Sequence, residues 1–313
     1  MTPARGEICP ISYNPLSSGE LYSTEGLKSL SKQLKSLRVL EMTSEELRIE
    51  AARRADKISI QGVQPKLSAK LRISRGCFEI VNRGGQYILK PQNDLYPELP
   101  ENEDLSMRLA GAAGIETPLH GLLYSKDGRF TYFIRRFDRL LSNKKVPLED
   151  FAQLAGKTRD TKYNFSMEGI VKIIDKFCSF PIIEKKKLLL RTLFNFITGN
   201  EDMHLKNFSL ITRDNVVELS PVYDLVNTTI AVESPKEELA LPLNGRKTKL
   251  HRKDFMEYFA CEKMGLNRNT AEDVLAQIKQ SYDTWRKLIG ISFLSDGMKN
   301  KYSRIIEERL SRL

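Results

Sequence analysis

The sequence predicts an α+β fold with a small strand-rich N-terminal lobe, residues 1–137, and a larger helical C-terminal lobe, residues 138–313. Short apolar runs separated by Gly-containing turns fill residues 67–136, which is typical of strands. Long segments with helical apolar spacing dominate from residue 166 onward. A length of 313 residues fits one large or two modest domains.

The N-terminal lobe is predicted to begin with a loop over residues 1–23, which are rich in Pro, Ser and Gly. A first helix is predicted because Leu27, Leu30, Leu34 and Leu37 recur at helical spacing. A capping box at Thr43 and Glu46 predicts a second helix that ends near Arg54. One further helix is expected over 101–113, and strands over 67–73, 78–81, 87–90, 121–124 and 130–136.

The C-terminal lobe is predicted to be helical over 166–178, 184–199, 252–262, 270–289 and 297–312. A single hairpin interrupts these helices, over 208–212 and 216–219, around Arg213-Asp214-Asn215. A strand-rich lobe followed by a helical lobe is the plan of a protein-kinase-like fold, with the linker expected near residues 135–139. The order of elements does not by itself fix a function.

Composition limits the partners and the compartment. The net charge of +10 favours polyanions such as phosphates, nucleotides or nucleic acid, or else serves solubility. The four cysteines show no paired spacing, so neither a disulfide framework nor a zinc site is expected. The N-terminus lacks the apolar block of a secretory signal, and no stretch has the ~18 apolar residues of a membrane helix. We therefore expect a cytoplasmic protein that does not act at a membrane.

The strongest chemical signal is the run Gly-Asn-Glu-Asp-Met-His-Leu-Lys-Asn-Phe-Ser, residues 199–209. Phosphoryl transfer needs one carboxylate to take the proton of the attacking hydroxyl. It also needs an amide oxygen and a second carboxylate to hold Mg²⁺ against the phosphates of ATP. Asp202, Asn207 and Asp224 fit these three roles in that order. Mg²⁺ prefers such hard oxygen ligands, so the pattern predicts a magnesium-dependent kinase.

Two other residues of this run have open roles. His204 is predicted to be a buried histidine that braces the loop beside the nucleotide, because a carboxylate two residues away is the better base. Lys206 either reaches the transferring phosphate as a catalytic residue or is simply exposed.

In the N-terminal lobe, two features could bind phosphates. Residues 57–66 contain one glycine, so they fit neither the P-loop nor the three-glycine kinase pattern. Their backbone amides could still surround phosphates, or the segment could be an ordinary loop that enters a strand. Lys90 ends a strand and is expected to pair with phosphates, oriented by Glu103 in preference to Glu101.

Three blocks of the sequence together resemble the HipA family of toxin kinases. They are residues 59–68, residues 136–139 with 147–153, and residues 202–209 with Tyr223-Asp224. The order and spacing of these blocks match the family over about residues 55–300.

The resemblance implies a serine/threonine protein kinase with Asp202 as the catalytic aspartate and Asn207 and Asp224 as magnesium ligands. It also implies that Lys90 holds phosphates and that Ser59 is autophosphorylated, which would lower activity by placing negative charge beside ATP. The backbone of the hinge, Arg135 to Phe137, would bind adenine, and residues near Glu149, Asp150 and Gln153 would lie near the protein substrate. The residues implied to cover the ATP phosphates are Gln61, Gly62, Val63, Gln64 and Lys66.

Full-length HipA proteins carry about a hundred further residues before this region, so the chain most resembles HipT, the shortened kinase of three-gene systems. That resemblance implies a small HipS-like partner that replaces the missing subdomain, and a HipB-like antitoxin that connects the complex to DNA. It implies an aminoacyl-tRNA synthetase as the substrate.

Two alternative functions fit part of the pattern. A small-molecule kinase would share Asp202, Asn207 and Asp224, but the block at residues 59–68 argues against it. A DNA-associated scaffold or pseudokinase would use the positive charge and predicts salt-sensitive DNA binding by the isolated chain.

Overall fold

The computed structural model describes residues 6–54, 64–140, 144–158, 160–232 and 237–313. Ser59, Gln61, Gly62 and Val63, expected to contact ATP, lie outside these residues. The chain divides into two compact units. The first unit comprises residues 1–105, 118–144 and 290–295, and the second comprises residues 106–117, 145–289 and 296–313.

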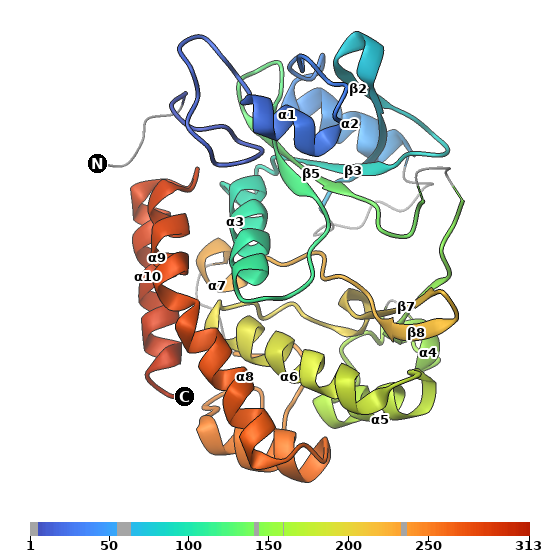
Figure 1. The fold of residues 1–313 in the computed structure, drawn as a ribbon, viewed down its shortest axis with the longest axis vertical. Helices are drawn as coiled ribbons and strands as arrows, with labels where there is room; N and C mark the ends of the chain where they lie inside the picture. The colour runs from blue at the N-terminus through green and yellow to red at the C-terminus, as the bar shows by residue number, and fades with distance from the viewer. Residues whose placement is uncertain (1–5, 55–63, 141–143, 159, 233–236) are drawn as a thin grey trace. The chain divides into compact units, whose positions relative to one another are not determined.

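A five-stranded antiparallel sheet with the order β2-β1-β3-β5-β4 forms the centre of the first unit (Figure 1). Leu67 and Ala69 are buried on β1, and Leu89 and Phe133 are buried on β3 and β5. These side chains join one apolar core cluster because alternate residues of a strand share a face. The strands are β1 (Leu67–Arg72), β2 (Cys77–Ile80), β3 (Tyr87–Pro91), β4 (His120–Tyr124) and β5 (Phe130–Arg135).

Two helices precede this sheet, α1 (Thr24–Leu30) and α2 (Ser44–Arg54). The predicted capping box of α2 is confirmed, because Thr43 N donates to Glu46 Oε2 at 2.8 Å and Glu46 N donates to Thr43 Oγ1 at 3.2 Å. The prediction that the first helix includes Leu34 and Leu37 is wrong. Both side chains are buried in the same core, but the chain leaves the helix at Ser31. Burial every three or four residues therefore arose without helical structure.

Helix α3 (Leu99–Ala112) follows the first three strands, and its residues after Leu105 belong to the second unit. Gly114 ends this helical region with φ = +81°, a backbone conformation that glycine adopts without strain. A Cβ at this position would lie 2.6 Å from Gln277 Nε2. The helix predicted over residues 101–113 is thus confirmed, with its start two residues earlier.

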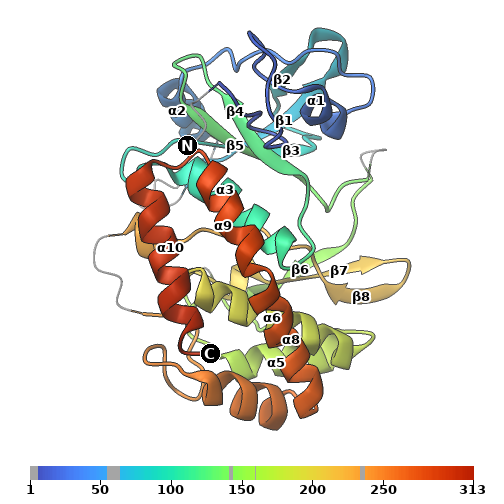
Figure 2. The same cartoon turned by 60° about the vertical axis from the view of Figure 1, so that its left-hand side comes forward.

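The second unit is mainly helical (Figure 2). Helix α6 is central to it, because residues 188–197 are all buried. No helix among the described residues has the length and apolar character needed to cross a membrane. The helices are α4 (Phe151–Leu154), α5 (Met167–Phe177), α6 (Pro181–Ile197), α7 (Thr228–Ala231), α8 (Arg268–Gln280), α9 (Tyr282–Ile291) and α10 (Asp296–Leu310), with a π-helical segment over Asp254–Lys263.

The single helix predicted over residues 270–289 is wrong, because α8 ends at Gln280 and α9 begins at Tyr282. Ser281 separates the two helices, and its hydroxyl donates to the carbonyl oxygens of Gln277 at 3.0 Å and Ala112 at 3.3 Å. A serine hydroxyl that bonds to the preceding turn competes with the helical pattern, which explains the break.

A three-stranded antiparallel sheet in the second unit has the order β6-β7-β8. Its strands are β6 (Leu148–Asp150), β7 (Ser209–Arg213) and β8 (Val216–Leu219). The predicted hairpin is confirmed, and Asp214 and Asn215 both have positive φ at its turn. The expectation that a single hairpin interrupts the helices is wrong. β6 pairs with β7 so that Asp150 lies opposite Ser209.

Candidate active site

The loop of residues 199–209 begins at a glycine that its surroundings require. Gly199 has φ = +70°, and a Cβ there would lie 2.7 Å from Thr229 Oγ1. The carbonyl oxygen of Gly199 accepts from both Thr228 Oγ1 and Thr229 Oγ1 at 3.1 Å, and Glu201 N donates to Thr228 Oγ1 at 2.8 Å. The start of the loop is therefore fixed to the first turn of α7.

The other end of the loop is fixed by Tyr223. Its hydroxyl donates to the carbonyl oxygen of Lys206 at 2.9 Å and contacts Ser209 Oγ at 2.5 Å. Asp224 follows directly and has φ = +55°, a conformation that costs energy in most residues but that Asp tolerates better than most. Tyr223 thus attaches the backbone next to Asp224 to the end of the loop.

Asp202 and Asn207 contact each other directly within the loop. Asn207 Nδ2 donates to the backbone carbonyl oxygen of Asp202 at 2.9 Å. This bond uses the amide nitrogen and leaves the amide oxygen as the acceptor, which is the atom that a magnesium ligand must offer. The Asp202 carboxylate is half-exposed at 52%, so a substrate hydroxyl can reach it.

His204 is buried beside this carboxylate. Its Nε2 lies 2.7 Å from Lys162 Nζ and 4.0 Å from Asp202 Oδ1. Burial lowers the pKa of His204, and Lys162 lowers it further, although Asp202 opposes the shift. The neutral ring therefore accepts from the Lys162 ammonium at Nε2. Its Nδ1 is buried and has no hydrogen-bond partner among the described residues.

Lys206 forms an ion pair with Asp150, whose Oδ2 lies 2.9 Å from Lys206 Nζ. The other oxygen of Asp150 accepts from Gln153 N at 2.8 Å, and Gln153 Oε1 accepts from Asp150 N at 2.9 Å. Asp150 and Gln153 thus form the capping box of α4. The segment that contains Glu149, which was expected near the protein substrate, lies next to the loop because β6 pairs with β7.

The first unit contains the ion pair expected from the strand lysine. Lys90 Nζ lies 2.5 Å from Glu103 Oε1, and both side chains are buried. Glu103 is therefore a partner of Lys90, as the sequence predicted. Gln64 Nε2 lies 3.4 Å from Glu103 Oε2, whereas Lys66 is exposed.

The expected hinge follows β5 in the first unit. Arg135 and Phe137 are both half-buried, and Arg135 N donates to the carbonyl oxygen of Leu119 at 2.8 Å. Asp138 forms ion pairs with Arg136 at 2.7 Å and Arg139 at 2.6 Å. Burial alone would raise the pKa of Asp138, but the two guanidinium groups hold it below its ordinary value.

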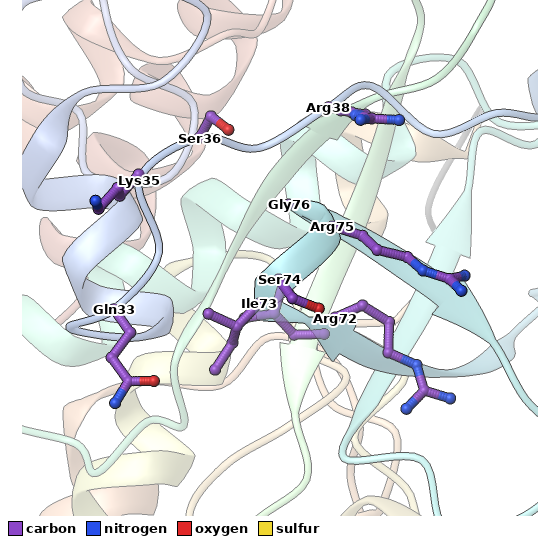
Figure 3. Close-up of a pocket in the computed structure, with 10 residues that line it drawn as sticks. Gln33, Lys35, Ser36, Arg38, Arg72, Ile73, Ser74, Arg75 and Gly76 are labelled. Carbon is purple, nitrogen blue, oxygen red and sulfur yellow. The ribbon is translucent and has the colours of Figure 1, made fainter.

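A basic hollow lies elsewhere in the first unit, beside the turn Ile73–Arg75. Figure 3 shows Lys35, Arg38, Arg72 and Arg75 around it, with their charged ends at separate places rather than at one point. A single phosphate group is bound by cationic side chains whose charged ends converge on it, and those of this hollow do not converge. None of the residues that the sequence predicted to bind ATP or metal lines this hollow.

Several residues of the site were missed by the sequence analysis. Tyr163 donates a hydrogen bond to the Asp202 carboxylate, and Lys162 contacts His204. Tyr223, Thr228 and Thr229 fix the two ends of the loop. The pair Lys162-Tyr163 lies in a polar segment without apolar periodicity, so no local pattern could have indicated its contacts.

No group of three or more His, Cys, Asp or Glu side chains among the described residues is placed to hold a metal ion. The expected ligand set consists of one amide and one carboxylate, with the phosphates of the nucleotide and water completing the coordination. Such a set contains only one of these four kinds of side chain, so it is not a group of three.

The fold is kinase-like, as solved structures show. A chain of the Shewanella oneidensis complex of the toxin–antitoxin proteins HipA and HipB with operator DNA matches with a TM-score of 0.67 and 20% identity, over 95% of this chain and 79% of that one. The Helicobacter pylori proinflammatory kinase CtkA matches with a TM-score of 0.53 and 16% identity, over 72% and 87% of the two chains.

The sequence identifies the family. Residues 58–285 match the family described as the HipA-like C-terminal domain, and the chain belongs to that family. It is 29% identical to a Haemophilus influenzae protein named "Putative kinase", over 92% of each chain. It is also 29% identical to the serine/threonine-protein kinase toxin HipA of Shewanella oneidensis, over 60% of this chain and 47% of that protein.

Proposed function

We propose that the chain is an ATP-dependent serine/threonine protein kinase of the HipA kind that acts as the toxin of a toxin–antitoxin system. One observation carries this proposal. A half-exposed carboxylate, Asp202, lies in a loop whose backbone is bonded to the Asn207 amide and whose ends are fixed by α7 and Tyr223. A base and a magnesium ligand held close together are what phosphoryl transfer to a hydroxyl requires.

In this proposal Asp202 accepts a hydrogen bond from the hydroxyl of the protein substrate and takes its proton as transfer proceeds. Its carboxylate is suited to this role because Oδ2 has no hydrogen-bond partner among the described residues, while the backbone of Asp202 is held on both sides. Asp202 N donates to Asn200 Oδ1 at 3.2 Å, and its carbonyl oxygen accepts from Asn207. A fixed backbone with an accessible carboxylate orients an acceptor without blocking it.

Asn207 and Asp224 are the proposed magnesium ligands. The Asn207 amide oxygen and the Asp224 carboxylate are hard oxygen donors, and the Asn207 amide is oriented by its bond to Asp202. Bound magnesium would neutralise charge on the transferring phosphate.

Lys90 and Glu103 are the proposed phosphate-binding pair of the first unit. A buried lysine whose ammonium is held by a carboxylate at 2.5 Å presents its charge in a fixed direction. We also assign ATP contacts to Gln64 and Lys66, and a place near the transferring phosphate to Lys206. The same proposal gives ATP contacts to Gln61, Gly62 and Val63, autophosphorylation to Ser59, and adenine binding to the backbone of residues 135–137.

The decisive test is Asp202→Ala in the full chain with radiolabelled ATP and magnesium. Loss of a general base lowers rates by about 10²–10⁴-fold, so transfer to protein should fall by that factor. Nucleotide affinity, measured by isothermal titration calorimetry, should stay within a factor of about two because the carboxylate does not hold the nucleotide. Asp273→Ala is a control that removes an exposed carboxylate outside the loop. Wild-type rates in Asp202→Ala would refute the assignment.

The proposed partners follow from the relatives. Because one solved structure that matches this chain is a complex of HipA, HipB and operator DNA, we propose a HipB-like antitoxin that links this chain to DNA. The aminoacyl-tRNA synthetase substrate and the HipS-like partner rest on the resemblance of the sequence. Phosphoproteomics after brief induction tests the substrate, and co-purification with the products of neighbouring genes tests the partners.

A further inference from the structure

Tyr163 lies against the carboxylate that we propose as the base. It belongs to the irregular chain between α4 and α5, and its hydroxyl donates a hydrogen bond to Asp202 Oδ1. A base must lie within hydrogen-bond distance of the proton it takes. The Tyr163 hydroxyl therefore has the relation to Asp202 that the hydroxyl of a protein substrate needs.

The neighbours of Tyr163 hold its ring in this place. The ring meets His204 edge-on, with centroids 5.0 Å apart and an interplanar angle of 84°. Lys162 Nζ lies 4.9 Å from the centroid of the same ring and 2.7 Å from His204 Nε2. Leu205 N donates to the carbonyl oxygen of Lys162 at 3.3 Å. Lys162 and Tyr163 thus contact His204 from two sides, next to the base.

The hydrogen bond between Tyr163 and Asp202 can break without a change in the rest of the unit. Tyr163 is 39% exposed, and the Asp202 side chain is 52% exposed. Besides the contacts of Lys162 with Leu205 and His204, the surrounding turn has short-range bonds, from Thr158 N to Thr161 Oγ1 and from Asn164 N to the carbonyl oxygen of Thr161, both 2.9 Å. Segments with few buried contacts open at low free-energy cost, so Tyr163 can leave Asp202 without unfolding the unit.

The Tyr163 phenol keeps its proton beside the Asp202 carboxylate. Burial raises the pKa of Tyr163, and the hydrogen bond to Asp202 raises it further, because a phenolate beside a carboxylate is unfavourable. At neutral pH the hydroxyl therefore stays protonated and donates to Asp202.

We infer that Tyr163 is an internal substitute for the substrate hydroxyl, which keeps Asp202 occupied until a protein substrate displaces it. This inference rests on the proposed kinase function and concerns the regulation of the same site. If only the fraction of molecules with Tyr163 displaced can bind substrate, the apparent affinity falls by that fraction. At saturating substrate every molecule is open, so the maximal rate does not depend on Tyr163.

The test is Tyr163→Phe in the full chain, with dephosphorylated casein as the acceptor. The KM for casein should fall about 5–10-fold, while kcat and the KM for ATP stay unchanged. Tyr282→Phe is the matched control, because Tyr282 donates to Glu307 Oε1 at 2.8 Å and so loses the same kind of bond elsewhere in the second unit. Its kinetics should equal those of the wild type.

Three other outcomes would overturn the inference about Tyr163. A lower kcat with unchanged KM in Tyr163→Phe would make Tyr163 a positioning residue and overturn the inference, as would phosphate on Tyr163 found by mass spectrometry. Transfer by wild type and Tyr163→Phe with equal KM would overturn it and leave the kinase function intact. The absence of both casein phosphorylation and autophosphorylation in every variant would instead contradict the kinase function.

A stability measurement tests the contact without relying on activity. In a double-mutant cycle of Tyr163→Phe and Asp202→Ala, urea unfolding should show that the two changes are not additive. Additive effects would overturn the inference, because Tyr163 would then not hold Asp202.

Discussion

Two groups of charged side chains from the proposed site, one in each unit, lie in contrasting environments. In the first unit, Lys90 and Glu103 form an ion pair in which both side chains are almost fully buried. In the second unit, the Asp202 side chain is 52% exposed and Lys206 is 42% exposed. A buried charge that loses its partner is destabilising, whereas an exposed charge is solvated by water. We therefore expect binding and stability to be inseparable at Lys90, but catalysis and stability to be separable at Asp202.

The largest expected effect follows from breaking the buried pair. Lys90→Met removes the ammonium group that neutralises the buried Glu103 carboxylate, which should lower the free energy of unfolding by about 3–5 kcal/mol. Lys206→Met breaks the exposed pair with Asp150 and should cost only about 0–1 kcal/mol. Urea unfolding followed by circular dichroism measures both.

A second variant separates charge burial from loss of packing. Adding Glu103→Leu to Lys90→Met also removes the buried negative charge and should restore most of the lost stability. Equal losses in Lys90→Met and Lys206→Met would contradict the contrast between the two units.

Asp224 sharpens the contrast within the second unit. Asp224→Ala and Asp224→Asn both remove the carboxylate, so magnesium-dependent nucleotide binding should be lost in both. Asn tolerates the positive φ of 55°, whereas Ala does not, so only Asp224→Ala should lose about 1 kcal/mol of stability. Calorimetric titration of nucleotide with and without magnesium, together with urea unfolding, separates the two effects. Unchanged magnesium-dependent binding in both variants would refute the ligand role.

The smallest effect concerns His204, which is buried in the second unit beside the half-exposed Asp202. Its pKa is lowered in the folded state, so on acidification the unfolded chain takes up this proton first, near a pKa of about 6.5. The unfolded state then binds more protons, and stability falls as pH decreases. The lowered pKa of His204 should therefore contribute a loss of at most about 1.4 kcal/mol per pH unit below this value.

His204→Gln should reduce this acid-dependent loss between pH 7.5 and 5.5, measured by urea unfolding at each pH. The control His251→Gln makes the same change at an exposed histidine of the same unit. An identical pH dependence in wild type and His204→Gln would show that His204 is not the group responsible.

How much the sequence could predict depended on whether a feature was local. Asp202 and Asn207 lie five residues apart, so one motif indicated both, and Lys90 and Glu103 occur at the end of a strand and the start of the next helix. The contact of Tyr163 with Asp202 joins residues 39 positions apart and exists only in the folded chain. β6 was missed because three residues, Leu148–Asp150, carry no alternation of their own and form a strand only beside β7.

The leucines near the N-terminus teach a related lesson. Leu34 and Leu37 are buried as their apolar character predicted, yet the same spacing wrongly predicted a helix there. The spacing of apolar residues indicates which side chains face a core. An irregular segment that runs along a core can have the same spacing as a helix. Burial was therefore predicted more reliably than backbone conformation.

Gly199 has no side chain that could take part in the reaction, yet its replacement should abolish the activity of the protein. Any side chain at this position would collide with Thr229 and force the backbone out of its positive φ. Asp202, which lies three residues further along the chain, would then move. If expression of the chain arrests growth, survivors of a genetic selection should carry lesions at Gly199 and Thr229 as well as at Asp202. The positions at which a mutation abolishes growth arrest would then include residues that do not contact the substrate or the nucleotide.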